Sequence, residues 1–314
     1  MVSIESHQVA IATMRLVSQY WVMSRVASTQ SASTRSASTQ SMFVAILLCL
    51  LPVLQTAPPA SAQAAQAQSS QAEAKPAAAA NSDARPILVE LFTSEGCSSC
   101  PPADALVEKM DKLQPVQGAQ LIVLSEHVDY WDHEGWKDAN SSPALTVRQS
   151  DYVRVLQLKS AYTPQVIVDG SLEMRANNAE QVRKILEDDL SAPKIPVRIG
   201  EVSVDPNNPA LLHARIEADG ESAKHNADVY VAITLDHVES QVLHGENGGR
   251  HLTHVAVVEQ ITKVGKLQKG KSFAETAQLK LKPGTNPANL RIVAFVQESG
   301  PGKVLGAALR KPTS

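Results

Sequence analysis

The most informative stretch of the chain reads Val89-Glu-Leu-Phe-Thr-Ser-Glu-Gly-Cys-Ser-Ser-Cys-Pro-Pro-Ala-Asp104. Its first residues continue an apolar run from Pro86 that is typical of a buried strand. Pro101 and Pro102 suit the first turn of a helix, where backbone N–H groups have no intrahelical acceptor to lose. The stretch therefore predicts a Cys-x-x-Cys pair at the start of a helix, directly after a strand.

This pair indicates thiol chemistry. Its spacing places two thiols within disulfide reach, and the free N–H groups of a helix amino terminus favour a thiolate. We expect Cys97 to be the more exposed, attacking thiol and Cys100 to resolve the mixed disulfide that it forms. No cofactor is expected for this exchange other than the redox-active disulfide Cys97–Cys100 itself.

Two further catalytic candidates are expected beside the pair. Glu90 interrupts the apolar strand, and a carboxyl buried there would have a raised pKa and could exchange a proton with Cys100. A solvent-facing Glu90 at a sheet edge is the equal alternative. Pro164 comes just before the strand-like run Gln165–Asp169, where a cis proline would lie against the cysteine loop and leave a backbone edge for an extended peptide.

An aromatic and polar segment, His127-Val-Asp-Tyr-Trp-Asp-His-Glu-Gly-Trp136, follows the buried run Leu121–Leu124. Its rings could form part of a substrate rim, for which the candidates are Thr163, Tyr162 and Trp131. The alternative, favoured for His127 and Trp131, is that the segment folds over the sheet and that a neighbouring acid satisfies the histidine.

The chain from Arg85 onward alternates between strand-like and helix-like segments, which predicts an α/β domain over residues 85–192. Helices are expected after Pro102, over residues 143–160, and from a capping box at Asn178 and Gln181 to about Leu190. Beyond this point, short apolar runs separated by turn sequences predict an antiparallel β-sandwich-like domain over residues 193–314.

The amino-terminal region predicts export. Residues 1–62 hold an apolar stretch, Met42–Leu54, and then Ala60-Ser-Ala62, which is typical of a secretory signal cleaved near Ala62. Residues 63–84 are expected to form a disordered linker. Cleavage would remove Cys49 and leave the Cys-x-x-Cys pair as the only cysteines in a periplasmic or secreted protein. The net charge of −3, without a basic block, argues against nucleic acid and against stable membrane association.

The predicted order of strand, Cys-x-x-Cys, helix, strand, helix, Thr-Pro, strand and helix looks like the thioredoxin superfamily. Four motifs resemble, more closely, the exported bacterial domain-of-unknown-function family twelve twenty-three: Val89–Asp104, His127–Asp132, Tyr162–Val166 and Val168–Gly170. A further segment, Gly245-Glu-Asn-Gly-Gly-Arg250, resembles a landmark of its carboxy-terminal part. By this resemblance Cys97 and Cys100 match the redox pair, and Pro164 matches the cis proline.

The expected function is disulfide exchange with protein thiols or with a redox partner protein. The Ser-Ser spacer and Gly96, where an aromatic residue is usual, leave the direction of electron flow open. A copper or zinc site built from Cys97, Cys100 and His127 is one alternative, although a second Cys-x-x-Cys or a His-x-x-x-His is missing. A non-catalytic binding module is the other.

Overall fold

The computed structural model describes residues 84–175 and 179–312 of the chain. The predictions for the signal region, for the linker up to residue 83 and for the Asn178 cap therefore concern residues outside the described part. Within that part, no helix is long and apolar enough to cross a membrane.

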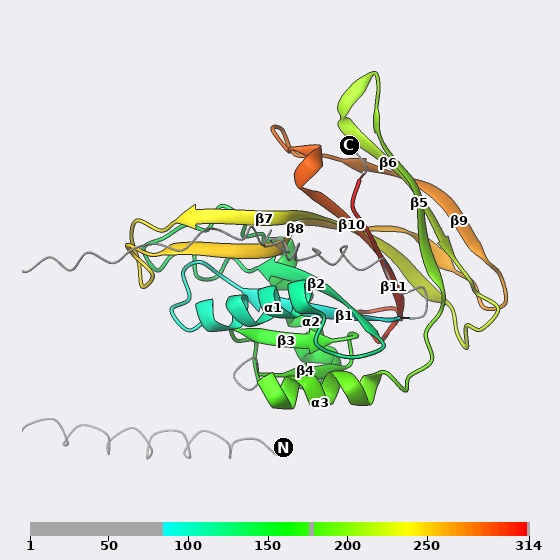
Figure 1. The fold of residues 1–314 in the computed structure, drawn as a ribbon, viewed down its shortest axis with the longest axis horizontal. Helices are drawn as coiled ribbons and strands as arrows, with labels where there is room; N and C mark the ends of the chain where they lie inside the picture. The colour runs from blue at the N-terminus through cyan, green and yellow to red at the C-terminus, as the bar shows by residue number, and fades with distance from the viewer. Residues whose placement is uncertain (1–83, 176–178, 313–314) are drawn as a thin grey trace, which may run out of the picture. The chain divides into compact units, whose positions relative to one another are not determined.

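Strands and helices alternate in the first half of the described chain (Figure 1). These elements are β1 (Arg85–Thr93), α1 (Pro101–Leu113), β2 (Ala119–His127), α2 (Pro143–Val155), β3 (Gln165–Val168), β4 (Leu172–Met174) and α3 (Ala179–Asp189). The predicted extent of α2 was too long, because Leu156 caps the helix and Gln157 adopts a left-handed φ of 54°.

The second half is built almost entirely of strands. They are β5 (Val197–Asp205), β6 (Asn208–Ala218), β7 (Ala227–Gln241), β8 (His251–Leu267), β9 (Phe273–Lys280), β10 (Leu290–Gln297) and β11 (Val304–Arg310), with a 3-10 turn, η1 (Pro287–Asn289), before β10. The longest of them, β8, was not among the strands predicted from the sequence.

The described strands form a mixed eight-stranded sheet in the order β11-β10-β7-β8-β2-β1-β3-β4 and an antiparallel three-stranded sheet in the order β5-β6-β9. The coarse prediction of an α/β part followed by antiparallel strands is confirmed. The predicted boundary near residue 193 falls between α3 and β5. However, four strands that follow it, β7, β8, β10 and β11, belong to the same sheet as β1. The junction is the parallel pairing of β2 with β8 at Ser125 and Val257.

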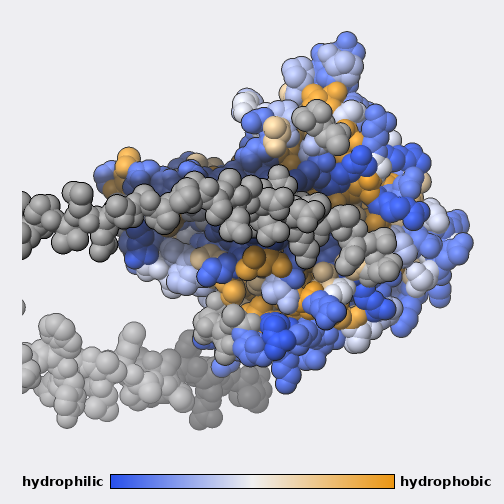
Figure 2. Space-filling view, viewed as in Figure 1, coloured by the Kyte–Doolittle hydropathy of each residue, from blue (hydrophilic) through white to orange (hydrophobic). Residues whose placement is uncertain are grey.

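Strand β1 is buried on both faces, which explains its nearly continuous apolar sequence. Val89 and Leu91 pack in the core that contains the inner side of α1. Leu88 packs on the other face, in the core that contains Leu145 of α2. The three-stranded sheet has a separate core against β7 and β10, to which Leu212 and Ile292 contribute. The face of the molecule in Figure 2 is mostly hydrophilic, with small hydrophobic patches.

A buried arginine joins α1 to the carboxy-terminal strands. Arg291 of β10 donates from its two terminal nitrogens to the two carboxylate oxygens of Asp111 in α1, at 2.6 and 2.8 Å. Its Nε also donates to Asp236. Burial alone would lower the pKa of Arg291, but the hydrogen bond and charge of Asp111 and then Asp236 outweigh it and raise that pKa.

Replacing this arginine should destabilise the protein. Arg291→Met leaves Asp111 without its cation and leaves Asp236 paired with Lys311 alone. We expect the free energy of unfolding to fall by about 2 to 3 kcal/mol, because the largely buried carboxylate of Asp111 loses its partner while Asp236 keeps one and is partly exposed to water. The matched control is Arg154→Met, which breaks an exposed pair with Asp151 and should cost less than about 0.5 kcal/mol. Urea unfolding of both variants measures the difference, and equal losses would contradict the prediction.

Candidate functional site

The Cys-x-x-Cys pair lies between β1 and α1, where the sequence predicted it. Cys97 and Cys100 form a disulfide with their Cα atoms 5.4 Å apart. Cys97 lies in a turn in which its N–H donates to Ser94 O, and Cys100 is the N-cap of α1. Pro101 and Pro102 occupy the first two helical positions.

The prediction that Cys97 is the more exposed cysteine was wrong. Both Cys97 and Cys100 are 0% exposed, whereas Ser98 and Ser99 between them are exposed. Ser99 Oγ lies 3.4 Å from Cys97 Sγ and donates to Thr163 O at 3.5 Å. The spacer residues thus cover the disulfide.

The start of α1 offers fewer free N–H groups than the motif suggested. Pro101 and Pro102 have none, because proline lacks a backbone N–H. The next two N–H groups, of Ala103 and Asp104, both donate to Cys100 O. Stabilisation of a thiolate by free amides at this helix end is therefore weaker than predicted.

Two of the three candidates for the substrate rim lie together beside the pair. The Thr163–Pro164 peptide bond is cis, as predicted. Trp131 Nε1 donates to Thr163 Oγ1 at 2.8 Å. The side chain of Tyr162 points to β4, where its hydroxyl donates to Glu173, and the backbone carbonyl of Tyr162 accepts from Gln149.

The tryptophan also explains why Gly96 precedes the first cysteine. A Cβ atom at Gly96 would lie 3.1 Å from Trp131 Cβ and 3.2 Å from Trp131 O. Such contacts are too tight for a larger residue unless the segment after β2 moves. Trp131 therefore occupies the space that a side chain at residue 96 would need.

Glu90 is buried, which agrees with one of its two predicted environments, but its contacts lie on the α2 side of the sheet. Its carboxylate accepts from Arg148 Nε at 2.7 Å and from the Tyr152 hydroxyl at 2.6 Å. Cys100 lies at the start of α1, and no hydrogen bond of the described residues joins it to Glu90. Proton exchange between these two residues stays a prediction without a supporting contact.

Glu126 lies beside the Glu90–Arg148 pair and is also fully buried. Burial and then the negative charge of Glu90 raise its pKa well above the ordinary value. Burial alone would lower the pKa of Arg148, but electrostatic attraction, chiefly from the carboxylate of Glu90, outweighs burial and raises that pKa. This group is a buried, charge-compensated link between β1, β2 and α2.

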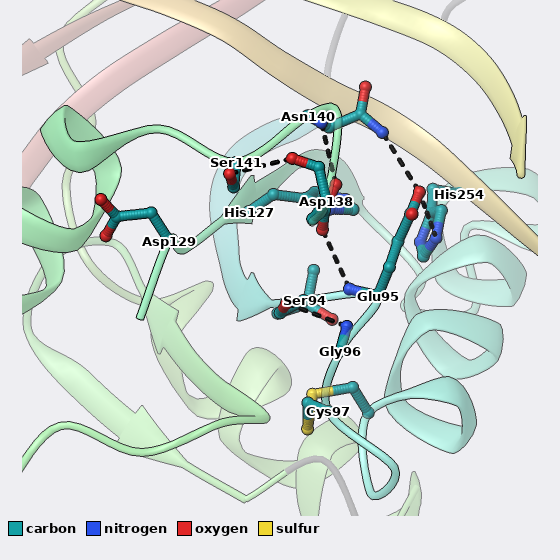
Figure 3. A network of polar contacts seen from close by, with 12 residues as sticks. Ser94, Glu95, Gly96, Cys97, His127, Asp129, Asp138, Asn140, Ser141 and His254 are labelled. Carbon is teal, nitrogen blue, oxygen red and sulfur yellow. Dashed lines mark hydrogen bonds and ion pairs between the residues drawn. A yellow bond between two sulfur atoms is a disulfide. The ribbon is translucent and has the colours of Figure 1, made fainter. Parts of the chain in front are cut away.

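A second buried polar cluster lies between the cysteine loop and β2 (Figure 3). His127 Nδ1 lies 2.6 Å from Asp138 Oδ2, which also accepts from Glu95 N at 2.9 Å. Glu95 Oε2 accepts from Trp136 Nε1 at 2.7 Å. The interpretation of His127 as a residue satisfied by a neighbouring acid holds for Nδ1, whereas the buried Nε2 has no hydrogen-bond partner among the described residues.

His254 of β8 completes this cluster and was not predicted as part of it. Its ring centroid lies 4.7 Å from that of His127. Its Nε2 lies 4.0 Å from Glu95 Oε1, and its Nδ1 lies 3.8 Å from Asp104 Oδ1. Among the described residues, no group of three His, Cys, Asp or Glu side chains is arranged to hold a metal ion. The structure does not bring His127 into contact with the cysteines.

The β7–β8 loop, residues 242–250, reaches the cysteine loop from the carboxy-terminal half. Asn247 is fully buried, and its Nδ2 donates to Glu95 O at 2.9 Å and to Cys97 O at 3.0 Å. The neighbouring Glu246 accepts from Ser98 N at 3.3 Å. The Gly-Glu-Asn-Gly-Gly-Arg run was the only sequence signal for this contact, and it gave no indication of the partner.

Asn247 should contribute to stability through its two hydrogen bonds. Asn247→Ala leaves two backbone carbonyls without their donor, so we expect the free energy of unfolding to fall by about 1 to 3 kcal/mol. The matched control is Asn289→Ala, because Asn289 also makes two hydrogen bonds to backbone, with His237, but at an exposed site. Thermal and urea unfolding should show the smaller loss in the control; the reverse order would refute the assignment.

The His127–Asp138 pair predicts a pH dependence. Burial alone would raise the pKa of Asp138, but the charge and hydrogen bond of His127, with two backbone donors, lower it to about 2. Burial alone would lower the pKa of His127, but Asp138 outweighs it and raises that pKa. The ionised Asp138 therefore stabilises the folded state at pH values above the pKa that this carboxyl has in the unfolded chain. The protonated His127 stabilises it at pH values below the pKa that this imidazole has in the unfolded chain.

Asp138→Asn should flatten the stability profile on both sides. Between pH 5 and pH 2 the unmodified protein should lose about 2 kcal/mol more than the variant, as Asp138 becomes protonated. Above about pH 6.5 it should also lose stability as His127 is deprotonated, and the variant should not. The control is Asp205→Asn, which breaks the partly exposed pair with His213 and should alter the dependence of stability on pH less, because water screens that pair. Parallel profiles for Asp138→Asn and the unmodified protein would exclude the ion pair.

Comparison with known proteins supports the family resemblance. The family model described as "Protein of unknown function (DUF1223)" matches residues 88–297. No protein with a curated description is significantly similar to the chain.

Three solved structures are similar to this chain to different degrees. Protein AGR_C_4864 from Agrobacterium tumefaciens superposes with a TM-score of 0.59 and 26% identity, over 74% of this chain and 96% of that one. A domain of the outer membrane lipoprotein Omp28 from Porphyromonas gingivalis has a TM-score of 0.25 and 15% identity, over 38% and 89% of the two chains. The sporulation control protein Spo0M from Bacillus subtilis has a TM-score of 0.25 and 9% identity, over 39% and 49%. The last two scores are too low to carry a structural argument.

Proposed function

The chain belongs to the DUF1223 family, whose description names no activity. From the site, we propose that this protein exchanges disulfides with protein thiols through Cys97 and Cys100. The observation that carries this proposal is the Cys97–Cys100 disulfide at the junction of β1 and α1, beside the cis Thr163–Pro164 bond. The proposal includes the exported location predicted from residues 1–62.

The element order supports a thioredoxin-like unit over residues 85–192. The chain runs from β1 through the Cys-x-x-Cys turn to α1, β2 and α2, and then through Thr163–Pro164 to β3, β4 and α3. That is the order from which the superfamily resemblance was drawn. Strand β1 pairs parallel with β2 and antiparallel with β3, so the cysteine turn and the cis proline meet at one end of the sheet.

A purely structural role for the disulfide is weakly motivated. The two cysteines are only three positions apart, and closing so short a loop contributes about 2 kcal/mol in the chain-entropy model, less than a bond between distant segments. The contact between the Ser99 hydroxyl and Thr163 O, next to Trp131, places polar and aromatic groups where a bound peptide could pass the disulfide.

The proposed reaction is a two-step exchange. A substrate thiolate attacks Cys97 Sγ, the Cys97–Cys100 bond breaks, and Cys100 leaves as a thiolate. A second substrate thiolate then attacks the mixed disulfide at the substrate sulfur and releases Cys97 as a thiolate. Two electrons pass from the substrate dithiol to the cysteine pair, and the reverse sequence reduces a substrate disulfide.

Reduction of the folded protein tests this proposal. Because both sulfurs are buried, the spacer residues must move for exchange to occur, and we expect glutathione to reduce the pair without denaturant. Cys100→Ser should trap a mixed disulfide with a protein partner at Cys97, whereas Cys97→Ser should trap none. Reduction that requires denaturant, at the rate of global unfolding, would show a structural disulfide and refute the proposal.

A further inference from the structure

The β7–β8 loop brings a carboxylate to the backbone beside the first cysteine. Glu246 Oε2 accepts a hydrogen bond from the N–H of Ser98, the residue directly after Cys97. Hydrogen bonds from Ser98 lower the pKa of Glu246, so its negative charge is present at neutral pH. A charge from the carboxy-terminal half of the chain is thus part of the surroundings of the cysteine turn.

The backbone at Glu246 is held in place by contacts of its own loop. Asn247, the next residue, is buried and bonded to the carbonyls of Glu95 and Cys97. Within the loop, Gly249 N donates to Val242 O at 2.8 Å. Gly245 has a φ of 74°, and a Cβ there would lie 3.1 Å from Glu134 O and 3.2 Å from Trp136 Cβ. The loop is packed on both the cysteine turn and the segment after β2.

A carboxylate in this position acts against ionisation of the neighbouring thiol. A thiolate is stabilised by nearby N–H donors and destabilised by a nearby negative charge. Here the N–H of Ser98 is already engaged by Glu246, and the first helical residues of α1 supply no free amide. The uncharged disulfide does not experience this repulsion, so the carboxylate opposes only the reduced, ionised state.

We propose that Glu246, positioned by Asn247, disfavours the Cys97 thiolate and thereby shifts the pair towards its disulfide form, which makes it a better reductant. This inference rests on the proposed function and gives it a direction. A thiol–disulfide protein is a strong oxidant when its reduced form is stabilised. The carboxy-terminal half of the chain thus tunes the chemistry of the cysteine pair.

The other ionisable groups around the cysteine turn come from four places. They are Glu95 in the turn itself, Asp104 in α1, His127 and Asp138 from β2 and the segment after it, and His254 in β8. All of them are buried and belong to the cluster described above. A substitution confined to Glu246 leaves them unchanged, so a comparison with the unmodified protein isolates its charge.

The test is Glu246→Gln, which keeps an oxygen that can accept from Ser98 but removes the charge. Full-length protein is reduced chemically, and the rate of iodoacetamide labelling of Cys97 is followed against pH by peptide mass spectrometry. We expect the thiolate–thiol equilibrium of Cys97 to shift about threefold towards the thiolate, a modest effect because solvent screens an exposed charge. Glu134→Gln is the matched control, since Glu134 is exposed on the segment packed against the same loop.

A second measurement distinguishes charge from structure. This measurement is the equilibrium of the protein with a glutathione buffer. In that reaction the protein disulfide and two glutathione thiols give the protein dithiol and glutathione disulfide, with transfer of two electrons and two protons. Above the thiol pKa values, Glu246→Gln should favour the dithiol about threefold, or about 14 mV. Below them it should have no effect, because neither thiol is ionised. A merely structural change would persist at low pH.

The outcomes separate this inference from the proposed function. An unchanged labelling profile in Glu246→Gln, or an equal shift in Glu134→Gln, overturns the role of Glu246 even if exchange with glutathione is rapid. A difference in potential that is the same at low and high pH also overturns it. Absence of exchange in the unmodified protein refutes the proposed function, while the labelling profile of the reduced protein still tests the acidity of Cys97.

Discussion

The continuity of the large sheet at β2 and β8 is the constraint on which the rest of the structure depends. These strands pair in parallel at Ser125 and Val257, and Ala256 lies in the core beneath α1. This pairing places the β7–β8 hairpin beside the elements that carry the cysteines.

Three consequences follow from that placement. His254 of β8 enters the buried cluster of Glu95 and His127. Asn247 binds the backbone of the cysteine turn, and Glu246 binds Ser98. The bidentate contact of Arg291 with Asp111 fixes the opposite side of α1 to β10. The helix that begins at the cysteine pair is therefore held at both ends by residues from the second half of the chain.

The site combines a motif that favours redox chemistry with surroundings that restrain it. The disulfide lies at a helix start beside a cis proline, but both sulfurs are buried, and proline replaces the first two helical N–H donors. The absence of a side chain at Gly96 leaves room for Trp131, whose Cβ and carbonyl oxygen lie where a Cβ of residue 96 would crowd them. For the proposed exchange, the turn would have to open locally before a substrate could reach either sulfur.

The local features were predictable because they arise from residues close together in the sequence. The apolar run of β1, the prolines of α1, the disulfide spacing and the Thr163–Pro164 turn each reflect backbone preferences over a few positions. The partner of His127 was also within reach, since Asp138 lies in the next segment. Each of these predictions concerned a short stretch with a clear physical preference.

The tertiary arrangement was needed for everything that depends on the far half of the chain. For Glu90, a buried and a solvent-facing position were equally open from the sequence. Its partners Arg148 and Tyr152 follow from which face of β1 meets α2, and a one-residue change in strand register would reverse that face. The burial of Cys97 and its contact with Asn247, which lies 150 residues away, depend on the pairing of β8 with β2. Local sequence patterns carry no information about such pairings, because they arise from the packing of whole strands and helices into one core.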